Sequence, residues 1–256
     1  MNINCITISV IAILMAGLLQ VGHTQSQVEG EKLQITATQL LSKSIRYHDP
    51  QNNWDSLNAT LNFKTLMADK SERKRVIRLN NKHGEFHFTG EYTEGRLEYT
   101  IDATSTKAMW NGSTTIPTDK ATKYQISEAR AVMFRNYFSY LYGMPMKLKD
   151  VGTIIDPVAY RVTFYDKIYD RIRVTYDPAI GTDTWYFYFN PETHALEAYQ
   201  FYKDESQNDG EYILFEETIM IDGIKIPRIR HWYYNCLLYT SPSPRDQRGS
   251  RMPSSA

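Results

Sequence analysis

The side chains best suited to proton transfer are His48 and Asp49, which stand directly before Pro50. A carboxylate close to an imidazole raises its basicity, so His48 could act as a general base with Asp49 or with a more distant carboxylate. Side chains of adjacent residues seldom face each other, however, and proline is tolerated mainly at helix ends. The alternative is therefore that these residues end a helix and have no catalytic role.

Aromatic residues make up 13% of the chain, and 18 of the 19 Tyr lie before residue 236. Their rings are apolar while Tyr O–H and Trp N–H groups need hydrogen-bond partners, so a wall of such residues suits acyl chains, sterols or sugars. The alternative is ordinary packing in the core of a sheet. The parity of the predicted strands and helices gives these candidate ligand-binding residues: Phe63, Phe88, Trp110, Tyr137, Tyr140, Trp185, Phe187, Tyr199 and Trp232.

Charge and cysteine content exclude several classes of function. Residues 1–24 contain no Lys, Arg, Asp or Glu and residues 236–256 contain three Arg and one Asp, which leaves 26 basic and 28 acidic side chains between them. A segment so close to neutral is not built to bind a polyanion, so we expect no nucleic acid partner. Cys5 and Cys236 both lie in the terminal segments, which leaves residues 25–235 without a disulfide, a thiolate metal site or a Cys nucleophile. We expect neither a metal nor a cofactor.

Residues 1–24 have the pattern of a secretory signal peptide. A mostly apolar run extends from Cys5 to Val21, and the sequence turns polar at His23. The run is too short and too close to the start for a transmembrane helix, which needs about 20 apolar residues; the alternative to a signal peptide is a membrane anchor. We therefore expect a mature chain that begins near residue 25, has no transmembrane span, is periplasmic or secreted, and is monomeric.

Residues 236–256 resemble a translated sequencing adapter. The segments from Cys236 to Asp246 and from Ser250 to Ala256 match the reading frame of such adapters, with a short index between them. We expect a non-native, disordered tail. The alternative is a natural disordered tail rich in Ser, Pro and Arg.

Two helices are predicted from their capping signals. Thr36 and Gln39 form a capping box for a helix that Pro50 stops. Ser127 is a good N-cap for a second helix, and Gly143 is its expected end. The apolar stripe predicted for the second helix is Ala129, Val132, Met133, Tyr137, Tyr140 and Leu141.

Alternating apolar and polar residues predict about ten strands. The alternation is clear over residues 57–64, and Asp222 with Gly223 gives the strongest hairpin signal. Successive strands without intervening helices favour antiparallel pairing. We therefore predict a mainly β fold of the α+β class: one curved antiparallel sheet that forms an open half-barrel, with two main helices covering its concave face. This single domain would span residues 25–235.

The predicted hairpin from Tyr186 to Phe201, with Asn190 and Pro191 at its turn, resembles a hairpin of the LolA/LolB-like lipoprotein carriers. That resemblance implies a half-barrel plugged by helices and a lipid or lipoprotein acyl chain as partner. The stretches 47–54, 135–149 and 183–188 are similar to an uncharacterised family of exported bacterial envelope proteins of Bacteroidetes type. This second resemblance covers most of residues 33–235 and implies no activity.

Three functions remain open from the sequence. The first is a non-enzymatic periplasmic or secreted carrier that holds a lipid or acyl chain in its curved sheet. The second is an envelope assembly protein without a ligand, which would show an exposed aromatic patch. The third is an envelope enzyme that depends on His48.

Overall fold

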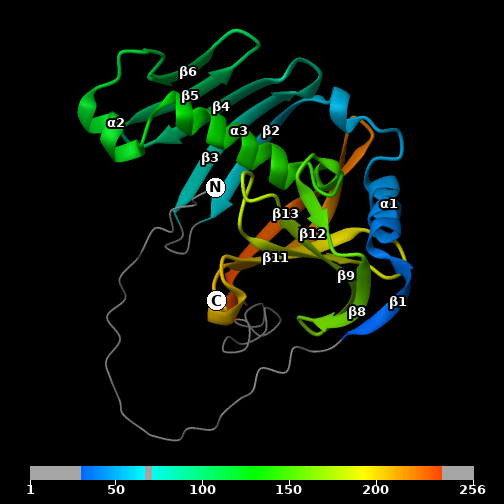
Figure 1. Ribbon diagram of the computed structural model, residues 1–256. Helices are drawn as coiled ribbons and strands as arrows, with labels where there is room; N and C mark the ends of the chain where they lie inside the picture. The colour runs from blue at the N-terminus through cyan, green and yellow to red at the C-terminus, as the bar shows by residue number, and fades with distance from the viewer. Residues whose placement is uncertain (1–29, 67–70, 238–256) are drawn as a thin grey trace, which may run out of the picture.

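The computed structural model describes residues 30–66 and 71–237, and within them the chain forms thirteen strands and three α-helices (Figure 1). The predicted signal peptide and most of the predicted tail lie outside the described residues. Among those described, no helix has the length and hydropathy of a membrane span. The predicted α+β class, rich in antiparallel strands, is confirmed.

The strands are divided between two antiparallel sheets, neither of which closes into a barrel. The prediction of one continuous sheet was wrong in this respect, because the alternation of residues marks strands but does not say which strands pair. The eight-stranded sheet has the order β1-β8-β9-β10-β11-β12-β13, with β7 paired to β9, and the five-stranded sheet is the meander β2-β3-β4-β5-β6. The bounds in the eight-stranded sheet are β1 Glu31–Thr36, β7 Thr153–Ile155, β8 Val158–Phe164, β9 Lys167–Tyr176, β10 Thr184–Phe189, β11 Leu196–Tyr202, β12 Glu211–Ile221 and β13 Ile224–Tyr234. Those in the five-stranded sheet are β2 Asn58–Leu66, β3 Glu72–Asn80, β4 Glu85–Tyr92, β5 Gly95–Ile101 and β6 Thr106–Trp110.

Both predicted helices begin and end where their caps indicate. Helix α1 spans Ala37–His48, and its capping box is complete: the Gln39 N–H donates to Thr36 Oγ1 (3.2 Å) and the Thr36 N–H donates to Gln39 Oε1 (2.9 Å). Helix α3 spans Glu128–Tyr142, its N-cap Ser127 accepts from the Arg130 N–H (3.1 Å), and it ends at Gly143. A short helix α2, Thr118–Tyr124, was not predicted.

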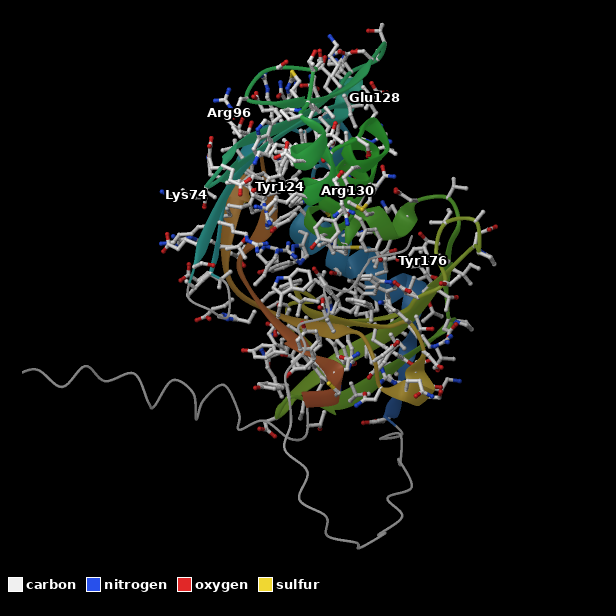
Figure 2. All side chains as sticks on the ribbon, turned by 90° about the vertical axis from the view of Figure 1, so that its left-hand side faces the viewer. Lys74, Arg96, Tyr124, Glu128, Arg130 and Tyr176 are labelled. Carbon is white, nitrogen blue, oxygen red and sulfur yellow. The ribbon has the colours of Figure 1, made fainter. Side chains whose placement is uncertain are left out.

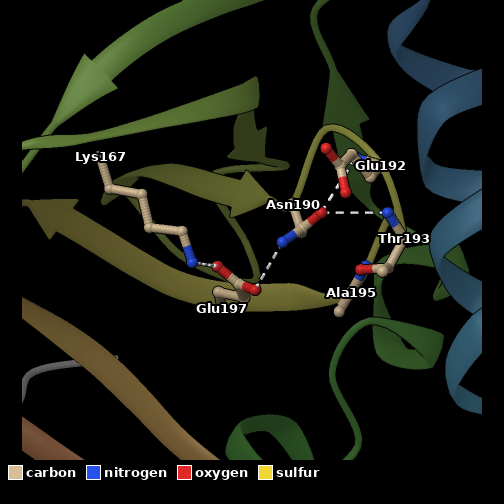
Figure 3. A network of polar contacts seen from close by, with 6 residues as sticks. All are labelled: Lys167, Asn190, Glu192, Thr193, Ala195 and Glu197. Atoms are coloured by element: carbon tan, nitrogen blue, oxygen red, sulfur yellow. Dashed lines mark hydrogen bonds and ion pairs between the residues drawn. The ribbon is translucent and has the colours of Figure 1, made fainter.

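Two hairpins set the register of the eight-stranded sheet. Asp222 (φ 50°) and Gly223 (φ 77°) adopt the left-handed conformations of a type I′ turn and join β12 to β13 as predicted. In the β10–β11 hairpin, the Asn190 side chain accepts from the N–H groups of Glu192 and Thr193 at 2.9 and 3.0 Å and donates to Glu197 at 2.9 Å (Figure 3). Glu197 also pairs with Lys167 of β9, so one amide side chain links the turn to the sheet.

Helix α3 lies between the two sheets (Figure 1), and its side chains pack against Phe88 of one sheet and Trp185 of the other. Its fully buried residues are Ala131, Phe138 and Leu141, whereas Ala129 is exposed. The predicted single stripe was therefore wrong at Ala129, which lies in the exposed first turn with Glu128. It also left out the buried Ala131 and Phe138, because a helix covered on two sides buries more than one face.

Candidate ligand-binding site

The face of α3 that meets the five-stranded sheet carries phenyl rings. Phe134 lies 4.8 Å from Phe88 of β4 and 5.2 Å from Tyr99 of β5, measured between ring centroids. Phe138 stacks on Phe88 at 6.0 Å. Among the elements of both sheets, β5 and β6 make the most extensive contact with α3. We call Phe134 and Phe138 the phenyl face; it anchors α3 to the five-stranded sheet.

The face of α3 that meets the eight-stranded sheet carries Tyr137, Tyr140 and Tyr142, which we call the tyrosyl face. Tyr140 packs edge-on against Trp185 of β10 at 5.3 Å, and its hydroxyl hydrogen-bonds to that of Tyr176 in β9. In the view of Figure 2, Tyr176 of β9 lies lower than Arg130 of α3. Burial raises the pKa of Tyr140 and of Tyr137 well above the ordinary value, so both hydroxyls keep their protons at neutral pH.

Trp185 stands at the centre of an aromatic layer on the inner side of the eight-stranded sheet. Its ring centroid lies 4.8 Å from that of Phe201, 5.6 Å from that of Tyr199 and 6.0 Å from that of Phe187. All four side chains are buried. The layer and the tyrosyl face are in direct contact.

Tyr142 at the end of α3 joins the free edges of the two sheets, β2 and β13. Its ring lies 4.6 Å from Phe63 of β2, and the Arg230 guanidinium of β13 lies 4.2 Å above it. Arg230 also lies 4.7 Å from the ring of Phe215, its partner across the β12–β13 ladder. Arg75 of β3 is paired directly with Phe63 in the five-stranded sheet. These five residues, Phe63, Arg75, Tyr142, Phe215 and Arg230, form what we call the seam.

The structure gathers most, but not all, of the predicted ligand-binding residues around α3. Tyr137, Tyr140, Trp185, Phe187 and Tyr199 lie between α3 and the eight-stranded sheet, and Phe63 lies at the seam. Three others lie apart from this group. Phe88 packs on the phenyl face, Trp110 stacks on Tyr124 of α2 at 4.9 Å, and Trp232 is 43% exposed on β13.

His48 and Asp49 are held by main-chain groups. The Leu196 N–H donates to His48 Nε2 (2.9 Å), so the other ring nitrogen, Nδ1, carries the proton and donates to the Lys225 carbonyl (2.7 Å). Burial is the main cause that lowers the pKa of His48 to about 4. The two oxygens of Asp49 accept from the N–H groups of Asn53 (2.8 Å) and Trp54 (2.9 Å). The pair thus ends α1 and ties it to β11 and β13.

Two surface clefts lie away from the predicted residues. One of about 360 Å³ lies between α3 and the β3–β4 turn, and one of about 410 Å³ lies at the β4–β5 turn. Neither is lined by any of the nine candidates. Within the described residues, no three His, Cys, Asp or Glu side chains group as metal ligands.

Arg75, Tyr142 and Arg230 were not among the candidates, although the sequence carries a signal for the two arginines. Arg75 shares strand parity with the buried Ile77, and Arg230 shares it with the buried Ile226. A cation on the apolar side of a strand marks a position worth testing. Tyr142 carries no such signal, because its role depends on how α3 is placed between the sheets.

The chain belongs to a family whose description is Family of unknown function (DUF6503), since the sequence model of that family matches residues 27–237. The expected membership in an uncharacterised family is thereby confirmed. No curated protein sequence matches the chain.

Proposed function

We propose that this protein is an exported, non-catalytic carrier that holds an apolar or amphipathic ligand, such as a lipid or acyl chain, between the tyrosyl face of α3 and the eight-stranded sheet. The observation that carries the proposal is the asymmetry of α3. Its phenyl face fixes it to one sheet, while its tyrosyl face meets the other sheet through rings with polar tips.

Binding in this place requires Tyr137 and Tyr140 to separate from the aromatic layer, because the two surfaces are in contact. A chain of methylene groups would replace the ring contacts with contacts of similar apolar character. Little apolar surface would therefore become exposed to water. The hydroxyls of Tyr140 and Tyr176 could find water or a ligand group when they part. Separation of the phenyl face would expose the rings of Phe134 and Phe138, which have no polar tip, although it would also free the buried hydroxyl of Tyr99.

The arrangement of His48 gives less support to an enzyme. Both of its ring nitrogens are engaged by main-chain groups, and its pKa of about 4 makes it a weak base. We therefore assign His48 to the scaffold of the proposed carrier and not to a catalytic site.

Brominated stearic acid tests the proposal, because bromine quenches indole fluorescence only at short range. We would compare two variants of the protein, one keeping only Trp185 and one keeping only Trp110, with the other Trp residues replaced by Phe. We expect saturable quenching of Trp185 and none of Trp110, which is buried to a similar degree but stacks on α2. Equal quenching of both, or none of either, would contradict the proposed site.

A further inference from the structure

Arg230 is a partly buried cation whose charge is not balanced by a neighbouring carboxylate. Its Nη1 donates to the Tyr199 hydroxyl (3.2 Å), its guanidinium lies over Tyr142 and Phe215, and its Nε is buried without a hydrogen-bond partner. Among the described residues, no Asp or Glu lies within ion-pair distance of it. A buried charge is costly unless it is paired, and aromatic rings compensate only part of that cost.

The carboxylates nearest to Arg230 along β12 are paired with other basic side chains or lie farther along the strand. Glu216, opposite Ile229, pairs with His231 (3.0 Å). Arg228, two residues before Arg230, is already paired with Glu217 (2.7 Å). Glu211 sits opposite Tyr234 in the β12–β13 ladder, four positions from the Phe215–Arg230 pair, or about 13 Å along the strand. It raises the pKa of Tyr199, to whose hydroxyl Arg230 donates, but it forms no ion pair with Arg230 within the described residues. Arg75 is a second cation beside Phe63, and it too has no carboxylate at ion-pair distance within the described part of the chain. Both arginines act on Tyr142, where they oppose the rise that burial causes in its pKa.

We infer that the seam binds the anionic head group of an amphiphile, a carboxylate or a phosphate, with Arg230 as the principal ligand and Arg75 as the second cation. The inference rests on the proposed function and names the class of ligand for the same site. A guanidinium can donate two parallel hydrogen bonds to either anion, and the free Nε of Arg230 supplies one of them. The Tyr142 hydroxyl, which keeps its proton, can donate another.

The position of the seam fits a ligand with a charged end and an apolar chain. Tyr142 touches Arg230, and two residues earlier on the same helix Tyr140 touches Trp185 in the aromatic layer. A head group at the seam would therefore place its chain along the tyrosyl face. Trp232 is 43% exposed and shares strand parity with Arg230, so it would lie next to the head group on β13.

Arg130 provides a matched control inside the same molecule. Like Arg230, it lies over an aromatic ring, that of Phe134 (5.5 Å), and its Nε is buried without a partner. It differs in lying in the first turn of α3, beside Phe134, whereas Tyr142 of the seam is the last residue of that helix. Arg228 is a second control, because it lies on the same strand as Arg230 but is paired with Glu217.

The test compares hexadecanoate, hexadecyl phosphate and hexadecanol, which share one chain and differ in the head group. Affinities would be measured by displacement of a fluorescent fatty acid from the wild-type protein and from Arg230→Met, Arg75→Met, Arg130→Met and Arg228→Met. We expect the wild type to bind at least one of the two anions about tenfold more tightly than hexadecanol, which corresponds to about 1.4 kcal/mol. Arg230→Met should abolish this preference and Arg75→Met should reduce it, while both control variants keep it. The anion that is preferred identifies the head group.

Each other outcome has a distinct meaning. Equal binding of all three compounds by the wild type would overturn the inference of an anionic head group but would leave the carrier proposal standing. Binding of none would overturn the carrier proposal itself. A preference that survives Arg230→Met, or that Arg130→Met removes to the same degree, would overturn the seam as its location. If Arg230→Met does not fold, an unchanged preference in Arg75→Met together with Arg230→Lys would overturn the inference equally.

Discussion

The two faces of α3 use rings of nearly the same size for different purposes. Phe134 and Phe138 meet the five-stranded sheet with carbon atoms alone, whereas Tyr140 meets the eight-stranded sheet with its ring on Trp185 and its hydroxyl on that of Tyr176. A buried hydroxyl must have a partner, and it can exchange one partner for another at little net cost. Under the proposed function, the phenyl interface of α3 stays closed while the tyrosyl interface opens.

The largest effect is expected from Phe138→Ala, which removes a ring that packs against Phe63, Phe88 and Phe134. Loss of a buried Phe leaves a cavity, so the free energy of unfolding should fall by about 3–5 kcal/mol, measured by urea denaturation. A loss below about 1 kcal/mol would show that the phenyl face is not the anchor of α3, and the comparison would fail.

A second prediction concerns acid, which should loosen the contact between α1 and the eight-stranded sheet. The pKa of His48 is about 4 in the folded protein and 6.5 for an exposed His, because burial disfavours the imidazolium. The unfolded chain therefore binds the proton first as the pH falls. The free energy of unfolding should be constant above about pH 7 and should be about 2 kcal/mol lower at pH 5. It should continue to fall until the pH reaches about 4, the pKa of His48 in the folded protein.

The measurement is the urea midpoint at pH 7.5 and at pH 5, with His48→Gln as the control. This variant should be less stable at pH 7.5 but should lose most of the pH dependence between these two values. If the urea midpoints of the wild type and the variant fell by the same amount between pH 7.5 and pH 5, a group other than His48 would cause the pH dependence. Hydrogen exchange should show the acid effect in α1 and β13 before the phenyl face.

A smaller effect is expected from Tyr140→Phe, which deletes one hydroxyl of the tyrosyl face. The change leaves the Tyr176 hydroxyl without its partner, so we expect a loss of about 1 kcal/mol. The double variant Tyr140→Phe with Tyr176→Phe should recover part of it, because the unpaired hydroxyl is then gone. Additive losses in this double-mutant cycle would count against a coupled pair of hydroxyls.

The smallest effect should come from Arg130→Met. The contact of Arg130 with Phe134 is a cation–π interaction at a partly exposed site, which contributes about 0.5 kcal/mol. Thermal or urea unfolding should change by no more than this amount. A much larger loss would mean that the phenyl face depends on a charge, which would blur the difference between the two faces of α3.

Local signals in the sequence predicted the elements well. The capping box of Thr36 and Gln39, the N-cap Ser127 and the Asp222–Gly223 turn all act within a few residues of the chain, and all three have the predicted geometry. Parity along single strands also placed Trp185, Phe187 and Tyr199 together on one face.

The alternation of residues along a strand predicts which face is buried, but it does not predict which distant element covers that face. Phe88 and Trp110 lie on buried faces as expected, yet α3 and α2 cover them, so they lie apart from the tyrosyl face. The same limit applies to His48, whose two partners, Leu196 and Lys225, are 148 and 177 residues away along the chain.

The sequence by itself therefore determined the helices, most of the strands, the aromatic character of the interior and the main hairpins, because these follow from contacts between near neighbours. Only the tertiary structure decided that the strands form two sheets, that α3 lies between them, and that Arg230 meets Tyr142 at their seam. These features depend on which free edges and faces come together in space. Hydrophobic burial is non-directional, so alternation in the sequence requires that a face be covered without specifying what covers it.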